Sequence, residues 1–543
     1  MKKSLKKIGL ALMTSMLVLG ALTACGGKDP GAENNTSSGA AGETTKVGES
    51  LAGTKTGGES TFTYAIAGDP GANVNVITTS DRFGLMTIKM IYSPLYMYNA
   101  DGINYFLAKS VEPSEDKLTY TVHLRDDVKW SDGEKFTADD VVFTFDAMEK
   151  EENAGWAYSQ LVYPEGSVKV AKVDDYTVTF TMPVVNAAAE EMISQIFIMP
   201  KHVYENVTSF ENNEVNSKPV GTGPYVMSEY SAGSYVKFTK NENYFLGAPA
   251  IDNIVYRIIE NENTAKTAIQ SGEVDAWIGT PTQVEQMDLK SNNLTVYPYQ
   301  EGRVGYLMMN SKRMTDENLR KAVLYAIDKK AIADAIFLDA ANYDLPWSFM
   351  PPNSEFFTED VEKYGQDLEK SKEFLAASGN KAPELTLAYS ATDSIQSTAA
   401  ILVQEQLQKV GIKVNLTGVD STALSQQMKK EDNAYDMYFG GYIMGIDPDT
   451  FTSLFESGSG FNYMHYNYPE IDELFSQGRK ETDKAKRKEI YTKLQQKIQD
   501  TACFYPLYSN KRLLVVSDRV TGIEDAKLVP VYTFEDTSKL KLK

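Results

Sequence analysis

The stretch LRDDVKWSDGEKFTADDVVFTF, residues 124–145, decides how the rest of the chain is interpreted. With the preceding His123 it gathers one histidine and six carboxylates over residues 123–140. Such a cluster could bind a metal or supply an acid and a base for catalysis. The alternative is that the same residues are the polar parts of a strand, a turn and a helix.

Local patterns favour this structural alternative. Apolar and polar residues alternate in KLTYTVHLR, residues 117–125, which predicts a strand with His123 on its polar face. The SDG triplet at 131–133 predicts a turn. Thr137 then stands at the N-cap of a helix, and the next two aspartates fall in its first turn, where carboxylates interact favourably with the helix dipole. We therefore predict no catalytic residue and no metal site in this stretch.

The remaining chain carries no recognised catalytic motif. It lacks the P-loop pattern, the G-x-S-x-G nucleophile motif, H-E-x-x-H and C-x-x-C. The segment 447–458 begins like a calcium loop but has Gly458 where a bidentate glutamate is required. His202 and His465 show no ligand spacing. The sequence predicts a protein without a cofactor or metal, although a pair of carboxylates for glycoside hydrolysis is not excluded by sequence.

Length and charge indicate a large globular protein. The chain has 543 residues, 42% of them hydrophobic, and a formal net charge of −20. That acidic balance argues against nucleic acid as a partner.

The N-terminus has the features of an exported lipoprotein. Four lysines precede the apolar run at 8–22, and residues 22–25 spell LTAC, which resembles the lipobox of bacterial lipoproteins. We predict a signal peptide at 1–24, lipidation of Cys25, and a flexible tether over 25–59 that holds the protein at the outer face of the cytoplasmic membrane. The alternative is an ordinary signal peptide. No later apolar run is long enough to span a bilayer.

A lipidated Cys25 leaves Cys503 as a single cysteine without an intramolecular partner. Because Cys503 lies in the apolar run TACFYPLY, we expect a small buried residue rather than a nucleophile.

Strand and helix signals mix along the chain and predict a mixed α/β (α+β) fold. The clearest signals are a strand at 60–69, a hairpin at 168–182, helices at 317–328, 396–410 and 484–499, and a strand at 411–419.

Residues 124–145 also resemble the signature of the family 5 extracellular solute-binding proteins, which are the oligopeptide, dipeptide and nickel receptors of bacterial ABC importers. Further matches follow in the order of that family and cover essentially everything after Ser60, at residues 218–230, 244–277, 319–332, 445–451 and 466–474.

The resemblance implies a two-lobed, periplasmic-binding-protein-like fold (class II, cluster C) with three domains. Lobe I would be discontinuous, an inserted domain II would interrupt it, and lobe II would be domain III. The implied boundaries are 60–95, 220–302 and 512–543 for lobe I, 96–219 for domain II, and 303–511 for lobe II.

The resemblance also implies a function. A ligand that contacts both lobes stabilises the closed form, and ABC permease subunits respond to that closure. We therefore expect a monomeric receptor without covalent chemistry. A secreted hydrolase is the alternative from another class.

The charged anchors of the family's short-peptide receptors appear in none of the matching positions. In YDMYFGGYIMGIDPDTF the usual tryptophan is Tyr442, the acidic position falls on Met444 or Gly445, and the arginine position on Phe439. The histidine position falls near Ile395 or Gln396. This argues against a site that reads both ends of a short peptide.

The remaining candidates for ligand contact are largely apolar or aromatic, and plain packing is the alternative for each of them. They favour a longer peptide held through its backbone, or an oligosaccharide stacked on aromatic faces, over nickel. The candidates are Tyr442, Phe439, Met444, Met308, Asp81, Arg82, Phe83 and Arg303.

Overall fold

A computed structural model describes residues 59–99, 102–153, 155–163, 165–211, 213–391, 393–443 and 447–543. The predicted signal peptide, Cys25 and nearly all of the tether lie outside these residues, as does Met444.

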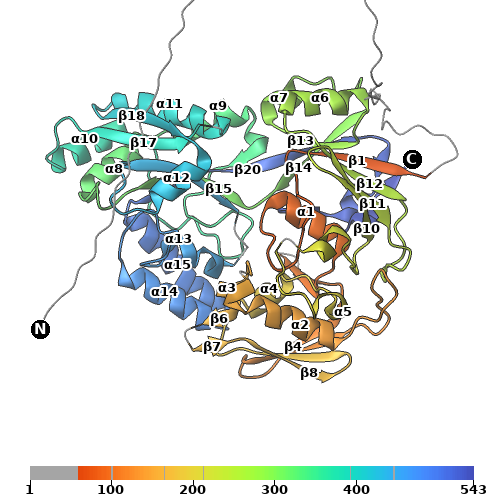
Figure 1. Cartoon of the computed structure of the whole chain (residues 1–543). Coiled ribbons are helices and arrows are strands. Elements are labelled where there is room, and N and C mark those ends of the chain that lie inside the picture. Colours follow the sequence, from red (N-terminus) through yellow and green to blue (C-terminus); the bar gives the residue numbers. More distant parts are fainter. Residues whose placement is uncertain are drawn as a thin grey trace, which may run out of the picture. The chain divides into compact units, whose positions relative to one another are not determined.

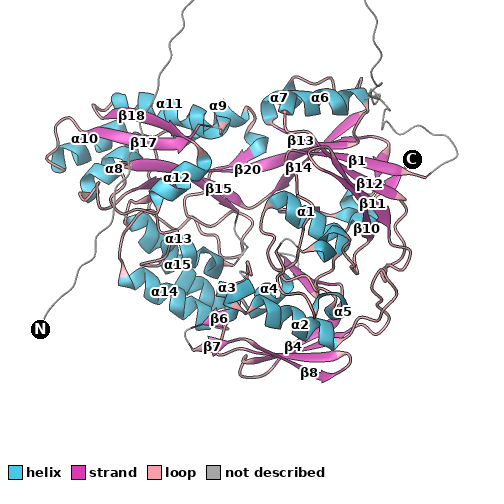
Figure 2. Ribbon diagram, in the orientation of Figure 1, coloured by secondary structure: helices cyan, strands magenta, loops and turns pink. Residues whose placement is uncertain are grey.

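One large mixed sheet organises the chain (Figures 1 and 2). Its strands run in the order β10-β11-β12-β1-β13-β20-β15-β19-β17-β18, and β14 and β16 also pair with β20. In that order they span Tyr225–Ser231, Tyr235–Lys240, Asn253–Ile258, Thr61–Ile66, Ala276–Gly279, Phe504–Ser517, Arg303–Met309, Met437–Ile443, Glu384–Ser390 and Lys413–Val419, with β14 at Leu294–Gln300 and β16 at Tyr343–Asp344.

Strand β20 joins the two halves of this sheet. Residues 504–508 pair with β15, and residues 513–516 pair with β13. The strand sequence FYPLYSNKRLLVVS is apolar at both ends and polar in the middle, at residues 509–512. The apolar parts of the strand are buried within the two halves of the sheet, as strands covered on both faces usually are. Residues 510–512, where the strand passes from one half to the other, are only half-buried and can be polar.

In the first half of the sheet, β1 pairs in parallel with both β12 and β13. Three helices accompany these strands: α1 (Arg82–Ile91), α6 (Glu262–Ser271) and α7 (Pro281–Glu285). Buried residues of α6, β13 and β20 form a cluster that includes Trp277 and Val515. A larger cluster joins β1 and α1 to residues 92–210.

In the second half, hydrophobic cores cover both faces of the sheet. The first core includes Leu307 and Phe439 and the helices α8 (Glu317–Ala326), α9 (Lys329–Phe337), α10 (Leu368–Ala377) and α11 (Ser394–Gln408). The second core includes Met308 and Tyr438 and the helices α12 (Ser421–Met428), α13 (Thr452–Phe455), α14 (Pro469–Lys480) and α15 (Lys484–Asp500).

The opening stretch folds as its pattern predicts. Strand β5 (Thr119–Leu124) belongs to a four-stranded antiparallel sheet with β4 (Ala108–Pro113), β9 (Thr177–Thr181) and β8 (Lys169–Asp174). Gly133 has a φ of 98° in the turn, and α2 (Ala138–Met148) follows. Thr137 forms a capping box with Asp140, whose carboxylate accepts the N–H groups of Thr137 and Lys201, both at 2.9 Å. The structural interpretation of the acidic cluster is thus confirmed.

The other predicted elements are also confirmed. The strand at 60–69 is β1, the hairpin is β8–β9, the helices are α8, α11 and α15, and the last strand is β18.

The remaining elements are short. They are β2 (Tyr96–Asn99), β3 (Gly102–Tyr105), α3 (Tyr158–Leu161), β6 (Val162–Tyr163), β7 (Gly166–Ser167), α4 (Ala189–Ser194), α5 (Lys201–Tyr204), β21 (Val520–Thr521), α16 (Ile523–Ala526), β22 (Leu528–Val529), β23 (Thr533–Phe534), β24 (Lys541–Leu542), and 3-10 turns at Glu151–Asn153, Glu214–Ser217, Ala340–Asn342, Pro448–Phe451 and Thr537–Lys539. Within the described ranges, no helix combines the length and the apolar character needed to cross a bilayer.

Candidate functional site

A cavity of about 230 Å³ lies at the carboxyl ends of three strands, and we call it the strand-end cavity. Residues 64–67 at the end of β1, Ile259 after β12 and residues 277–279 at the end of β13 line one part of it. The first residues of α1, α6 and α7 line another part. The carboxyl ends of parallel strands are where open α/β sheets bind ligands, so this is the position expected for a binding site.

The second half of the sheet contributes the opposite side of this cavity. Phe337 at the end of α9 and Ile395 in the first turn of α11 both line it. Between the two halves lie Asn510, Lys511 and Arg512, the polar centre of β20. A group bound in the cavity therefore contacts residues from both halves.

Asp81 fixes the start of α1 and with it two of the lining residues. Its carboxylate accepts the N–H of Phe83 at 3.0 Å and of Gly84 at 2.9 Å, as an N-cap does. A Cβ atom on Gly68 would come within 2.4 Å of the Phe83 ring, so the ring lies directly against that backbone. Arg82 and Phe83 line the cavity, whereas Asp81 positions them.

Three basic side chains line the strand-end cavity: Arg82, Lys511 and Arg512. Arg82 forms an ion pair of 2.5 Å with Glu301, and Arg512 lies 3.8 Å from the other oxygen of the same carboxylate. The Glu301 side chain is only 2% exposed. Although burial alone would lower it, the hydrogen bond and charge of Glu301 raise the pKa of Arg82, which therefore stays charged.

Of the predicted contact residues of the second half, the four that the structure describes are not among those that line the strand-end cavity. Phe439 and Met308 are 3% and 1% exposed and belong to the two cores on opposite faces of the sheet. Tyr442 is half-buried against the second core, and burial raises its pKa. Arg303 is half-buried, and its guanidinium lies over the backbone of Gly441. A Cβ atom added to Gly441 would come within 2.6 Å of that guanidinium. Phe439 and Met308 thus pack within the cores in this structure.

Sequence reasoning missed several lining residues. Trp277 and Phe337 follow ordinary apolar patterns, so nothing in the sequence marked them. Lys511 and Arg512 had one available signal, because SNKR interrupts an otherwise apolar strand at 509–512.

Neither a cluster of metal-ligating side chains nor an accessible thiol occurs in the described part of the chain. No three His, Cys, Asp or Glu side chains gather there as a metal site would require. Cys503 is buried, and burial raises the pKa of its thiol. His202 contacts Asp132 at 2.8 Å on the surface.

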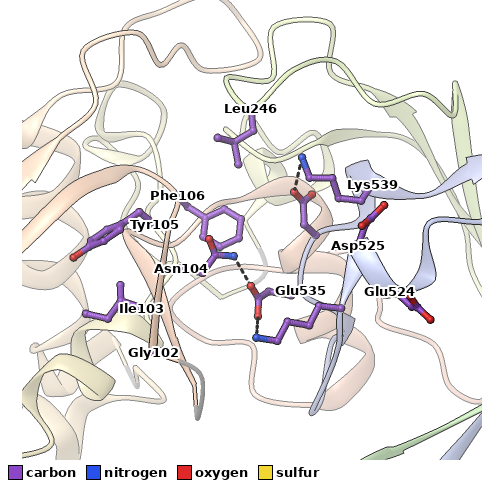
Figure 3. A pocket seen from close by; sticks show the side chains of 12 residues that line it. Gly102, Ile103, Asn104, Tyr105, Phe106, Leu246, Glu524, Asp525, Glu535 and Lys539 are labelled. Atoms are coloured by element: carbon purple, nitrogen blue, oxygen red, sulfur yellow. Dashed lines mark hydrogen bonds and ion pairs between the residues drawn. The ribbon is translucent and has the colours of Figure 1, made fainter.

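A second cavity, of about 500 Å³, lies between residues 102–106 and the C-terminal segment 524–539 (Figure 3). Its four carboxylates outnumber its two lysines, and both lysines lie close to one of these carboxylates. Asn104 donates to Glu535, Lys527 lies 3.7 Å from the same carboxylate, and Lys539 lies 3.8 Å from Asp536. Because no described residue of the second half of the sheet lines it, a ligand there would not join the two halves.

Comparisons with known proteins agree with this geometry. The model of the bacterial extracellular solute-binding proteins, family 5 Middle, matches residues 102–463. The oligopeptide-binding protein AppA of Bacillus subtilis is 26% identical over 558 aligned positions, which cover 98% of each chain.

Solved structures give the same result. The ABC transporter substrate-binding protein CtaP of Listeria monocytogenes superposes with a TM-score of 0.86 at 34% identity, over 89% of this chain and 99% of that one. AppA of Bacillus subtilis in complex with a nonapeptide superposes with a TM-score of 0.75 at 25% identity, over 89% and 99%. The expected periplasmic-binding-protein-like fold is confirmed, and the chain belongs to the bacterial extracellular solute-binding proteins of family 5.

Proposed function

We propose that this protein is a receptor that captures an oligopeptide and delivers it to the permease subunits of an ABC importer. It binds its ligand without turnover and needs no cofactor. The observation that carries the proposal is the strand-end cavity, which is lined from both halves of a sheet joined through β20. A ligand held there binds the closed arrangement better than an open one and so shifts the population toward closure.

The ligand class rests on the relatives. AppA of Bacillus subtilis is named for oligopeptides and has been solved with a nonapeptide. An oligosaccharide is the second candidate, because the aromatic rings of Phe83, Trp277 and Phe337 line the cavity and could stack on sugars.

We also propose the three-domain division. Lobe I would comprise 60–95, 220–302 and 512–543, with domain II at 96–219 and lobe II at 303–511. The exchange of partners along β20 supports the last boundary, since residues 504–508 pair with β15 and residues 513–516 with β13.

For the site we propose that Arg82 and Phe83 contact the ligand and that Asp81 holds them in place. From the second lobe, half-buried Tyr442 and Arg303 remain the candidates for direct contact, followed by Met444. Phe439 and Met308 support the strands from within the cores.

For location we propose that diacylated Cys25 anchors a monomer to the outer face of the cytoplasmic membrane, because two acyl chains give stable anchoring. Cys25→Ala should move the protein out of the membrane fraction or stall its processing. Retention of a processed Cys25→Ala protein in the membrane fraction would refute the anchor.

The function is tested by native mass spectrometry of the freshly purified protein, followed by titration calorimetry with the peptides found. We expect co-purified peptides of several residues and saturable binding. Chromogenic peptides and glycosides should remain intact on prolonged incubation. Binding of oligosaccharides but of no peptide would favour the second candidate, and turnover of any substrate would favour a hydrolase.

A further inference from the structure

We propose that the strand-end cavity binds a carboxylate group of the ligand, held by Arg82, Lys511 and Arg512. This inference rests on the proposed peptide-receptor function and specifies what the ligand must present at this position.

The basic residues have more hydrogen-bond donors than the protein uses. A guanidinium carries five N–H donors, and among the described residues only Glu301 accepts a hydrogen bond from that of Arg82. The Nε of Arg512 is buried and faces Glu301 at 3.8 Å, but within the described ranges no hydrogen bond engages the two terminal nitrogens of its guanidinium. Lys511 forms no ion pair with any residue that the structure describes. Most of the donors at this surface are therefore available to a ligand.

The local charge balance also favours an anion. Three cations line the cavity against one lining carboxylate, Glu262, which lies on the exposed first turn of α6 and accepts a hydrogen bond from Gln283. Glu301 behind the surface neutralises one cation. The cavity remains positive in a chain whose formal net charge is −20. The first turns of α1, α6 and α11 also border it, but the carboxylates of Asp81 and Asp393 already accept the first N–H groups of α1 and α11.

Most of the remaining lining is apolar, which further restricts the chemistry of the group that can bind. Phe83, Trp277, Phe337 and Ile395 surround the basic residues. A volume of about 230 Å³ is below the range of whole drug-sized sites and suits one residue of a longer ligand. The arrangement fits a carboxylate carried by an apolar residue, such as the C-terminal residue of a peptide. An aspartate or glutamate side chain is the other source of the same chemistry.

This carboxylate-binding site is formed by other residues than the charged anchors of short-peptide receptors, which are absent from this sequence. Those positions are Phe439, Met444 or Gly445, and the neighbourhood of Ile395; of the two that the structure describes, Ile395 lines the cavity and Phe439 does not. The ligand's charge is recognised through the first half of the sheet and through β20.

The test uses three peptides of one sequence that has an apolar C-terminal residue and no acidic side chain. The first has a free C-terminus, the second is amidated, and the third is amidated but carries one glutamate next to the end. We expect amidation to weaken binding at least about tenfold by titration calorimetry, as the loss of charge-assisted hydrogen bonds would. If the third peptide regains the affinity of the first, the site also accepts acidic side chains of the ligand. If it does not, the site is specific for the C-terminal carboxylate. Equal binding of all three peptides overturns the proposal.

Two variants locate the effect. Lys511→Gln removes a cation that has no partner among the described residues, so folding should be unaffected. It should reduce the free-to-amidated affinity ratio at least threefold, and Arg512→Gln should reduce it further. The control is Arg257→Gln in β12, which removes an arginine of the same half that pairs with Glu273 away from the cavity. It should leave the ratio unchanged. An unchanged ratio in Lys511→Gln and Arg512→Gln would refute the assignment to these residues.

A small probe separates this proposal from the peptide-receptor function. The probe 3-phenylpropionate presents a carboxylate and a phenyl ring, and 3-phenylpropionamide is its neutral match. When the protein is titrated with either compound at millimolar concentration, only the acid should shift the indole N–H signal of Trp277 in the NMR spectrum. Lys511→Gln should reduce that shift. If no peptide binds but the acid does so selectively, the function proposal fails and the carboxylate site stands. If peptides bind and acid and amide behave alike, the carboxylate site fails.

Discussion

Replacement of Glu301 by glutamine gives the sharpest test of how charge works at the strand-end cavity. Glutamine keeps the size of the side chain and removes its charge. The carboxylate is 2% exposed and bridges Arg82, whose side chain is 23% exposed, and Arg512, whose side chain is 33% exposed. Two cations would then face each other without a counter-ion.

Stability should fall. Removing one partner of a fully buried ion pair costs about 3–5 kcal/mol. Because both arginines reach solvent, we expect a smaller loss of about 1–3 kcal/mol in the free energy of unfolding. Urea denaturation followed by circular dichroism measures it.

Affinity for a free peptide should rise at the same time. A ligand carboxylate about 6 Å from Glu301 would be repelled by about 3 kcal/mol at an effective dielectric constant of 20. Solvent reduces this value, so we expect a gain of about tenfold for the free peptide and little change for its amide. The control Glu273→Gln breaks a surface pair with Arg257 and should change either quantity by less than about 0.5 kcal/mol. A Glu301→Gln protein that binds the free peptide more weakly than the wild type would refute this reasoning.

Three further predictions concern residues away from the cavity. Asp447→Asn should reduce the free energy of unfolding in urea by about 3–5 kcal/mol, because the Arg487 side chain is 6% exposed and would lose its charged partner; a loss below about 1 kcal/mol would contradict the buried pair. His123→Ala, on the exposed face of β5, should leave ligand affinity by calorimetry within about threefold, and a larger loss in a folded protein would show that the acidic cluster does bind ligand. Burial raises the pKa of Asp449 from 3.8 to about 6, against the opposing charge of Arg479. Between about pH 4 and 6 the folded state therefore binds this proton more tightly than the unfolded state. The free energy of unfolding of the wild type, minus that of Asp449→Asn, should fall as the pH rises through this range. An increase in this difference would contradict the raised pKa.

Local elements could be predicted from the sequence because their signals are local. Alternation fixed the hairpin β8–β9, and helical spacing fixed α8, whose apolar face is buried as expected. The capping box of α2 was indicated by Thr137 and the two acids after it. In each case the pattern that predicts the element is also the interaction that stabilises it.

The site could be predicted only in part, because it is assembled from distant segments. Arg82 and Arg512 come close together because β20 pairs with β13 and β14. This pairing joins distant segments, and no local sequence pattern predicts it. Phe439 and Met308 were selected as cleft residues, but both faces of their strands are covered by hydrophobic cores. In such a strand, apolar residues occur on each face, and sequence periodicity cannot separate packing from ligand contact.

The charges around the strand-end cavity connect binding to the passage of the chain between the two halves of the sheet. Glu301 directly precedes Gly302, whose φ of 71° suits glycine, at the link from β14 to β15. Arg512 lies on the other link, within β20, and Arg82 lies at the start of α1.

The Glu301 carboxylate thus lies close to Arg82 of α1 and Arg512 of β20, next to both links between the halves of the sheet. Glu262 and Glu301 already carry two negative charges, so a ligand carboxylate that uses the spare donors of Arg82 and Arg512 adds a third to the three positive ones and can bind without displacing Glu301. A further glutamate in the protein would neutralise the site before the ligand arrived, whereas glutamine at position 301 would leave the arginines repelling each other. A single buried glutamate therefore keeps the unliganded protein stable and leaves the cavity positive enough to attract an anionic group, which is why Glu301→Gln should change stability and affinity in opposite directions.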